Sequence, residues 1–156
     1  MPPALTPRLT ADEIAKAEIA TRLPIEDLRN RIRDKIASGK HRFREDSANY
    51  EINRVISTQV IRLFNLFEWK CVYCGISLDM GAVDDNIYFP DQLTIDHVVP
   101  LSKNGLHVIN NVVCSCRYCN ELKDSKTVEE FMADRGLDYK KFYAYVGKIR
   151  LQYGMF

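Results

Sequence analysis

The first forty residues show the spacing of apolar and polar positions that is typical of two helices. Thr10 and Glu13 form a capping-box pattern, which predicts a helix that ends near Arg22. Pro24 suits the first turn of a second helix, and Gly39 suits its end. We therefore expect a pair of helices at the start of the chain.

A third helical pattern covers residues 48–69. Its apolar residues recur every three or four positions, so they share one face. They are Ile52, Val55, Ile56, Val60, Leu63, Phe64 and Phe67. We expect this face to pack into the core, because an apolar stripe on a helix is usually buried.

The pattern changes to short apolar runs after residue 74. Residues 93–100 (LTIDHVVP) and 109–115 (INNVVCS) predict two strands. The segment SKNGLH, residues 102–107, has the Gly and Asn content of a connecting turn. The middle of the chain therefore predicts a strand pair.

Helical spacing returns after the second strand. Residues 117–126 (RYCNELKDSK) predict the start of a helix. Thr127 and Glu130 form another capping box, and Gly136 follows the helix that they open. A last helix is expected over residues 138–153. The fold class predicted by these elements is α+β.

Composition limits the classes of protein that the chain can be. It has 156 residues, 46% of them hydrophobic, and a formal net charge of +1. This fits one globular domain, or a small core with helical additions, and any nucleic-acid surface must come from a local patch. No apolar run approaches the ~18 residues of a membrane span, and the N-terminus lacks an apolar signal core. We expect a cytoplasmic, intracellular protein of prokaryotic or phage origin, with no membrane partner.

One local patch is strongly basic. Residues 29–44 hold seven Lys or Arg and one acid, a net charge of +6. Arg29 and Arg33 share one helix face, and Arg31 and Lys35 form a neighbouring stripe. The segment is either an arm that binds DNA phosphates, to which His41 would contribute, or a solvated helix face.

Five cysteines give the clearest chemical pattern. They are Cys71, Cys74, Cys114, Cys116 and Cys119. Four of them form two C-x-x-C pairs, CVYC and CRYC, the spacing with which structural zinc sites supply four thiolates. Without a secretion signal, this spacing favours a metal site over disulfides. Cys114 falls outside both pairs, and we expect it to be a small buried residue.

The cysteine pairs enclose an acid and a histidine side by side. Forty-one residues separate Cys74 from Cys116, and this insert contains Asp96 and His97. Neighbouring residues in a strand point to opposite faces. Asp96 could then reach a cation while His97 faces substrate, or a twist at the strand end could bring both into one pocket.

The order CVYCG, DHVVPLSKNG, NNVVCSCRYCNELK resembles the HNH endonuclease family, in its zinc-containing branch, over about residues 68–126. The resemblance implies a ββα-metal (HNH) hairpin core held by a four-cysteine zinc site, with helical N- and C-terminal extensions. We therefore divide the chain into residues 1–48, an N-terminal extension with the basic segment; 49–126, the nuclease core; and 127–156, a C-terminal helical segment.

The resemblance also implies roles for individual residues. His97 would be the general base, and Asn111 would position the loop that holds it. Asp96 and Asn120 would be ligands of a catalytic divalent cation, and their hard oxygen atoms suit Mg²⁺ or Mn²⁺. Asn110 precedes Asn111, so a shift of one residue in the hairpin would exchange their roles.

The function implied is metal-dependent hydrolysis of DNA, with double-stranded DNA as the expected partner. Arg117 and Lys123, on the helix beside the zinc, are candidates for phosphate contacts, although Lys123 could equally be a solvated lysine. His107 lies in the hairpin loop, where a lone histidine is more often only exposed.

Two other functions stay open at this point. One is a zinc-containing DNA-binding or adaptor module without catalysis, which would have no need of Asp96, His97, Asn111 and Asn120 together. The other is a nuclease that acts on RNA with the same site. A double-strand break would need two protomers or two events, so a homodimer is one possible arrangement.

Overall fold

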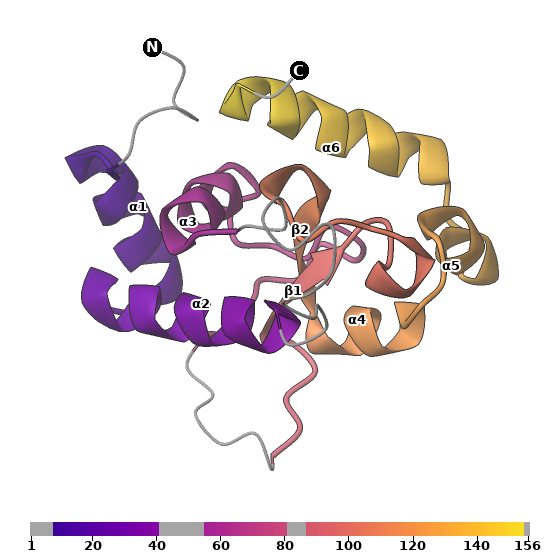
Figure 1. The fold of residues 1–156 in the computed structure, drawn as a ribbon, viewed down its shortest axis with the longest axis horizontal. Coiled ribbons are helices and arrows are strands. Elements are labelled where there is room, and N and C mark those ends of the chain that lie inside the picture. Colours follow the sequence, from indigo (N-terminus) through magenta and orange to yellow (C-terminus); the bar gives the residue numbers. More distant parts are fainter. Residues whose placement is uncertain (1–7, 41–54, 81–86, 155–156) are drawn as a thin grey trace.

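The computed structural model describes residues 8–40, 55–80 and 87–154. Within them, helices surround a two-stranded antiparallel sheet (Figure 1). The elements are α1 (Ala11–Thr21), α2 (Ile25–Lys40), α3 (Ser57–Leu66), β1 (Leu93–His97), the 3₁₀ helices η2 (Leu101–Lys103) and η3 (Ile109–Asn111), β2 (Val112–Cys116), α4 (Arg117–Lys123), α5 (Val128–Asp134) and α6 (Tyr139–Tyr153). The predicted order of helices and strands is confirmed for these residues.

The two N-terminal helices begin where their sequence signals lie. The backbone N–H of Glu13 donates to the Thr10 hydroxyl at 3.1 Å, and the backbone N–H of Thr10 donates to the Glu13 carboxylate at 2.8 Å. This is the predicted capping box. Arg22 ends α1 in the left-handed conformation, with a φ of 59°. Helix α2 then starts directly after Pro24.

Helix α3 is shorter than the predicted helix, and residues 48–54 of that prediction lie outside the described residues. Nearly all of α3 is buried, including the charged side chain of Arg62. The Arg62 guanidinium is paired with the Glu13 carboxylate, with 2.6 Å between Nε and Oε2. This ion pair fixes α1 against α3.

The strand pair is followed at once by α4, which gives the order β-β-α. In the register, Asp96 lies opposite Val113 and His97 lies opposite Val112. Strand β2 is buried along its whole length, and α4 packs against both strands. The ββα core and its flanking helices match the fold class that the sequence predicts.

One hydrophobic cluster joins all of these parts. It contains residues of α2 and α3, the strands, and α5 and α6. Thr127 caps α5 by accepting from the Glu130 N–H at 3.1 Å, and Asp138 caps α6 by accepting from the Lys140 N–H at 2.9 Å. The proposed boundaries at residues 48 and 126 stay a prediction. None of the helices in the described part of the chain is both long and apolar enough to cross a membrane.

Candidate metal centre and active-site cleft

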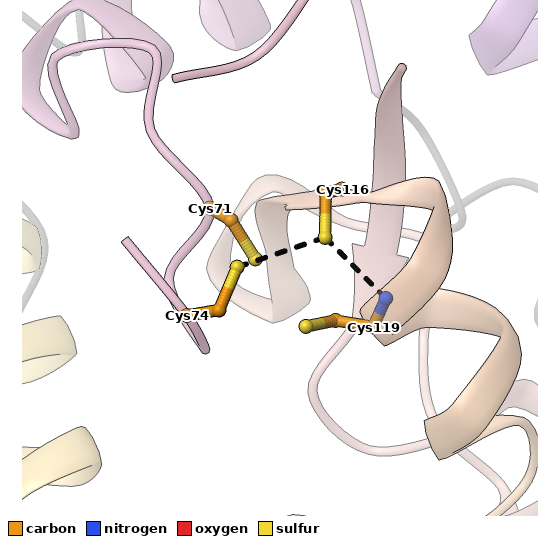
Figure 2. A group of neighbouring side chains, drawn as sticks. All are labelled: Cys71, Cys74, Cys116 and Cys119. Carbon is orange, nitrogen blue, oxygen red and sulfur yellow. Dashed lines mark hydrogen bonds between the residues drawn. The ribbon is translucent and has the colours of Figure 1, made fainter. Parts of the chain in front are cut away.

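The four cysteines of the two C-x-x-C pairs converge at one point. Figure 2 shows the side chains of Cys71 and Cys74 meeting those of Cys116 and Cys119. Their sulfur atoms all lie within 4.8 Å of one another, and the Cys74 and Cys116 sulfurs are 3.8 Å apart. Tetrahedral zinc with Zn–S bonds of ~2.3 Å places its sulfur ligands ~3.8 Å apart. The residues therefore fit a four-thiolate zinc site.

Tight local turns bring each pair of sulfurs together. Gly75 closes the first turn, where its N–H donates to the Cys71 carbonyl at 2.8 Å and its φ is +80°. At the second turn the Cys116 sulfur caps α4 by accepting from the Cys119 N–H at 3.4 Å. Two residues between thiolates are enough for each turn.

The thiols influence one another strongly. Hydrogen bonding with Cys119 lowers the pKa of Cys71 to about 5, whereas burial raises the pKa of Cys116 to about 11. Cys114 does not join the cluster. Its thiol is fully buried and donates to the Lys70 carbonyl at 3.1 Å, and burial raises its pKa. This confirms the prediction for Cys114.

A cleft of about 830 Å³ lies beside the cysteine cluster. Asp96 and His97 from β1 line it together with Asn120 from α4, which directly follows the cluster residue Cys119. The other lining residues are Lys35, Gln92, Thr94, Ile95, Pro100, Leu101, Ser102, His107, Arg117, Glu121, Asp124 and Ser125. His97 is the last residue of β1, and here the adjacent acid and histidine line one cavity. The second of the two arrangements expected for this pair is the one observed.

Asp96 is buried, and two side chains donate to it. The hydroxyl of Tyr73 donates to its Oδ2 atom, and the ammonium group of Lys123 lies 3.4 Å from the same oxygen. Burial raises the pKa of Asp96, and the charge of Lys123 and the bond from Tyr73 oppose part of this effect. Burial, followed by the Asp96 charge, raises the pKa of Tyr73 well above its usual range, so its hydroxyl is the donor.

Lys123 is placed differently from the prediction. We expected it on the nucleic-acid surface or in solvent, but its side chain is 1% exposed. Its ammonium group donates to the His97 carbonyl at 2.9 Å, besides pairing with Asp96. Helical spacing indicated the face that carries Lys123, but it could not show that this face packs against β1.

His107 also differs from its expectation, because it is 1% exposed. Its Nδ1 atom shares a hydrogen bond of 2.9 Å with Nε2 of His97, and the ring centroids are 5.1 Å apart. No local pattern in the loop sequence distinguishes this histidine from an exposed one. The contact arises because the loop folds back toward the end of β1.

Asn111 holds that loop closed. Its amide oxygen accepts from the Val99 N–H at 2.9 Å, and its amide nitrogen donates to the carbonyls of Val99 and Leu106 at 3.0 and 2.9 Å. Asn110 is exposed. The loop also needs Gly105, since a Cβ atom there would lie 1.9 Å from the Val99 carbonyl oxygen. These contacts favour Asn111 over Asn110 as the loop-positioning residue.

Two basic side chains line the cleft, Arg117 from α4 and Lys35 from α2. Arg117 also pairs with Glu121 at 3.1 Å. Arg29 and Arg33 are not among the described residues that line the cleft, and Arg33 is exposed on α2. His41 and the rest of residues 41–44 lie outside the described residues. The basic stripe of α2 that reaches the cleft is therefore the neighbouring one, through Lys35.

Comparison with known proteins agrees with this geometry. Residues 71–126 match the family model described as HNH endonuclease. No curated protein and no solved structure matches the chain. The match begins at Cys71, ends after α4, and so contains the four cysteines, both strands and the helix that completes the ββα order. Residues 71–126 are therefore similar to HNH endonuclease domains, and they contain a four-cysteine cluster that can hold a metal.

Proposed function

We propose that the chain is a metal-dependent endonuclease that hydrolyses phosphodiester bonds of DNA. The observation that supports this most strongly is the shared cleft of Asp96, His97 and Asn120. A zinc-containing binding module would need the cysteine cluster, but it would not need these three side chains in one cavity. The family match of residues 71–126 supports the same class of activity.

His97 is the general base of the proposed reaction. Its imidazole lines the cleft and is held by the ring of His107 on one side. It takes a proton from the attacking water, a step to which a positioned base contributes about 10²- to 10⁴-fold. Asn111 keeps the loop after β1 closed, so that the end of β1 and the His107 ring keep their places.

Asp96 and Asn120 are the proposed protein ligands of a catalytic divalent cation. Carboxylate and amide oxygens suit Mg²⁺ or Mn²⁺, and both side chains line the cleft. When bound there, such a cation supplies charge that stabilises the phosphate and the leaving oxygen. The contacts of Asp96 Oδ2 with Lys123 and Tyr73 keep the carboxylate in one orientation.

Zinc in the cysteine cluster has a structural role in this proposal. The cluster connects the loop of Cys71 and Cys74 to the start of α4, the helix that carries Asn120. Four thiolates leave no open position for substrate. The zinc therefore fixes the helix that supplies a ligand to the neighbouring cleft.

Double-stranded DNA is the proposed substrate, and Lys35 and Arg117 are the proposed contacts to its phosphates. Both line the cleft from different helices, so they flank the residues that perform the reaction. Contacts of Lys and Arg to phosphate oxygens position nucleic acid without reading its sequence. RNA offers the same phosphates, so the experiment below includes it.

The test is cleavage of supercoiled plasmid by the purified, zinc-loaded chain with Mg²⁺ or Mn²⁺. We expect nicked circles that appear with time, stop on addition of EDTA, and depend on protein concentration. RNA of matched sequence is incubated in parallel and should be cut more slowly. Absence of plasmid cleavage with either cation, in protein that keeps its zinc and its fold, would contradict the proposal.

A further inference from the structure

Tyr73 lies between the two cysteines of the first pair, but its hydroxyl group serves the cleft. The side chain is 7% exposed, and its hydroxyl donates to Oδ2 of Asp96, 23 residues later in the chain. The residue thus connects the cysteine loop directly to a carboxylate of the proposed active site.

The ring of Tyr73 is held by the C-terminal helices. It stacks on Phe142 of α6, with centroids 5.2 Å apart and an angle of 5° between the planes. Phe131 of α5 packs edge-on against it, with centroids 5.3 Å apart. Both phenylalanines lie beyond residue 126, where the family match ends. Helix α5 packs against α4 and α6, and α6 packs against α3 (Figure 1). These helices therefore fix the direction of the hydroxyl group.

We propose that Tyr73 is a positioning residue that sets the orientation of the Asp96 carboxylate for its divalent cation. Through its ring, the C-terminal helices α5 and α6 contribute to cation binding without touching the cleft. This inference rests on the proposed function, because it assigns Asp96 as a cation ligand. It adds a role for residues that the family match does not cover.

The two donors to Asp96 act in different ways. Lys123 brings a charge, and its ammonium group also serves the His97 carbonyl at 2.9 Å. Tyr73 brings a neutral hydroxyl, so its removal leaves the net charge of the site unchanged. Both side-chain donors meet Oδ2, so the proposal assigns Oδ1 of Asp96 to the cation. A hydrogen-bonded partner behind a metal ligand typically accounts for about 10- to 100-fold in metal affinity or activity.

The experiment compares Mn²⁺ binding to the zinc-loaded wild-type chain and to Tyr73→Phe, measured by the electron paramagnetic resonance signal of free Mn²⁺. Tyr73→Phe keeps the ring between Phe131 and Phe142 and removes only the hydroxyl. We expect the Kd for Mn²⁺ to rise about 10- to 100-fold. Plasmid cleavage should need correspondingly more Mn²⁺, with a smaller loss of rate at saturating Mn²⁺, and the zinc content should stay that of wild type.

Tyr143→Phe is the matched control. The hydroxyl of Tyr143 also donates to a carboxylate, that of Glu129 at 2.9 Å, but at an exposed place outside the cleft. This variant should bind Mn²⁺ as the wild type does. A second variant, Phe142→Leu, keeps the Tyr73 hydroxyl but removes the stacked ring, and it should weaken Mn²⁺ binding less than Tyr73→Phe.

Three outcomes would overturn the inference. The first is equal Mn²⁺ affinity of Tyr73→Phe and wild type. The second is an equal loss of Mn²⁺ affinity in Tyr73→Phe and Tyr143→Phe. The third is loss of zinc from Tyr73→Phe, which would place the effect at the cysteine loop. A wild-type chain that binds Mn²⁺ but does not cleave DNA would contradict the nuclease proposal instead. The comparison of Mn²⁺ affinities would still decide the role of Tyr73.

Discussion

The side chains of the proposed active site are oriented by hydrogen bonds and ion pairs with individual neighbouring residues. The buried carboxylate of Asp96 would be costly without its two donors, Lys123 and Tyr73. His97 is held through its ring by His107 and through its carbonyl by Lys123. Asp96 and His97 are thus each oriented by neighbours that have no direct part in the proposed reaction.

The side chain of Asn111 holds the loop after β1 through hydrogen bonds to the backbone. Asn111→Ala removes three hydrogen bonds to the backbone of Val99 and Leu106. We expect a loss of about 0.5–1.5 kcal/mol in the free energy of unfolding, because water can replace part of these exposed hydrogen bonds. Plasmid cleavage should fall as well, since the loop no longer fixes the end of β1. Urea unfolding and the cleavage rate measure the two effects.

Asn110→Ala is the control, because Asn110 is the exposed neighbour of Asn111. It should change stability by less than about 0.5 kcal/mol, as surface substitutions usually do. Similar losses in both variants would show that the loop is not held by the Asn111 side chain.

Among the helices and strands, local sequence signals predicted the order of the elements and the starts of several helices. They did not predict the strand limits, since β1 ends at His97 and β2 begins only at Val112. The capping box at Thr10, the side-chain cap at Thr127 and the two C-x-x-C turns depend on residues within four positions, and such signals can be read from the sequence. The burial of Lys123 and His107 could not be predicted from the sequence, because it depends on how α4 and the loop after β1 pack against that strand. The same reason explains why Lys35, and not Arg33, reaches the cleft.

The contact between α1 and α3 gives a prediction for pH. Burial raises the pKa of Glu13, but the hydrogen bonds and charge of Arg62, with the bonds at Thr10, outweigh burial and lower it from its usual value of 4.5. A lowered folded-state pKa contributes stability above pH 4.5, and this contribution is lost as pH falls through the folded-state value.

We therefore expect Glu13→Gln to lower the free energy of unfolding by about 1–3 kcal/mol at pH 7, because Arg62 loses a charged hydrogen-bond partner in a largely buried place. The difference from wild type should shrink as the pH falls below 4.5. Urea unfolding of both proteins at several pH values measures it. A difference that is constant from pH 7 to pH 3 would exclude the ionised pair as its source.

Helix α2 gives a second prediction at this scale. Lys35→Ala should reduce the slope of log affinity for duplex DNA against log salt concentration by about 0.9, the value for one lost phosphate contact. Arg33→Ala should leave the slope unchanged, because Arg33 does not line the cleft. A smaller slope for Arg33→Ala, with an unchanged slope for Lys35→Ala, would place the phosphate contacts on the helix face of Arg29 and Arg33 instead.

At the scale of the whole molecule, the cysteine cluster and the C-terminal helices converge on the cleft. The four-cysteine cluster joins the 71–74 loop to α4. The hydrophobic core joins this loop and α4 to α3, α5 and α6. Spacing predicted that the four cysteines would lie together, and the family resemblance singled out Asp96, His97 and Asn120, which all line the cleft. Their roles stay a prediction. The sequence did not predict that α5 and α6 would hold Tyr73, because aromatic contacts between distant segments have no local pattern.

Loss of zinc should therefore loosen the entire core. Cys119→Ser should lower the melting temperature sharply and reduce the bound zinc, because a structural metal contributes directly to folding free energy. Cys114→Ser should keep about one zinc per chain, since its sulfur lies outside the cluster. Metal analysis and thermal unfolding measure both. Loss of zinc from Cys114→Ser, with zinc retained in Cys119→Ser, would overturn the choice of ligands.

We propose that His97 activates water in the cleft that it shares with Asp96 and Asn120. This role of His97 is tested most directly by the rate constant of plasmid nicking at saturating Mn²⁺ and saturating DNA, compared between wild type and His97→Ala with equal zinc content and melting temperature. We expect the rate to be lower by about 10²- to 10⁴-fold in His97→Ala, with Mn²⁺ and DNA affinity retained. Equal rates in the two proteins would contradict it.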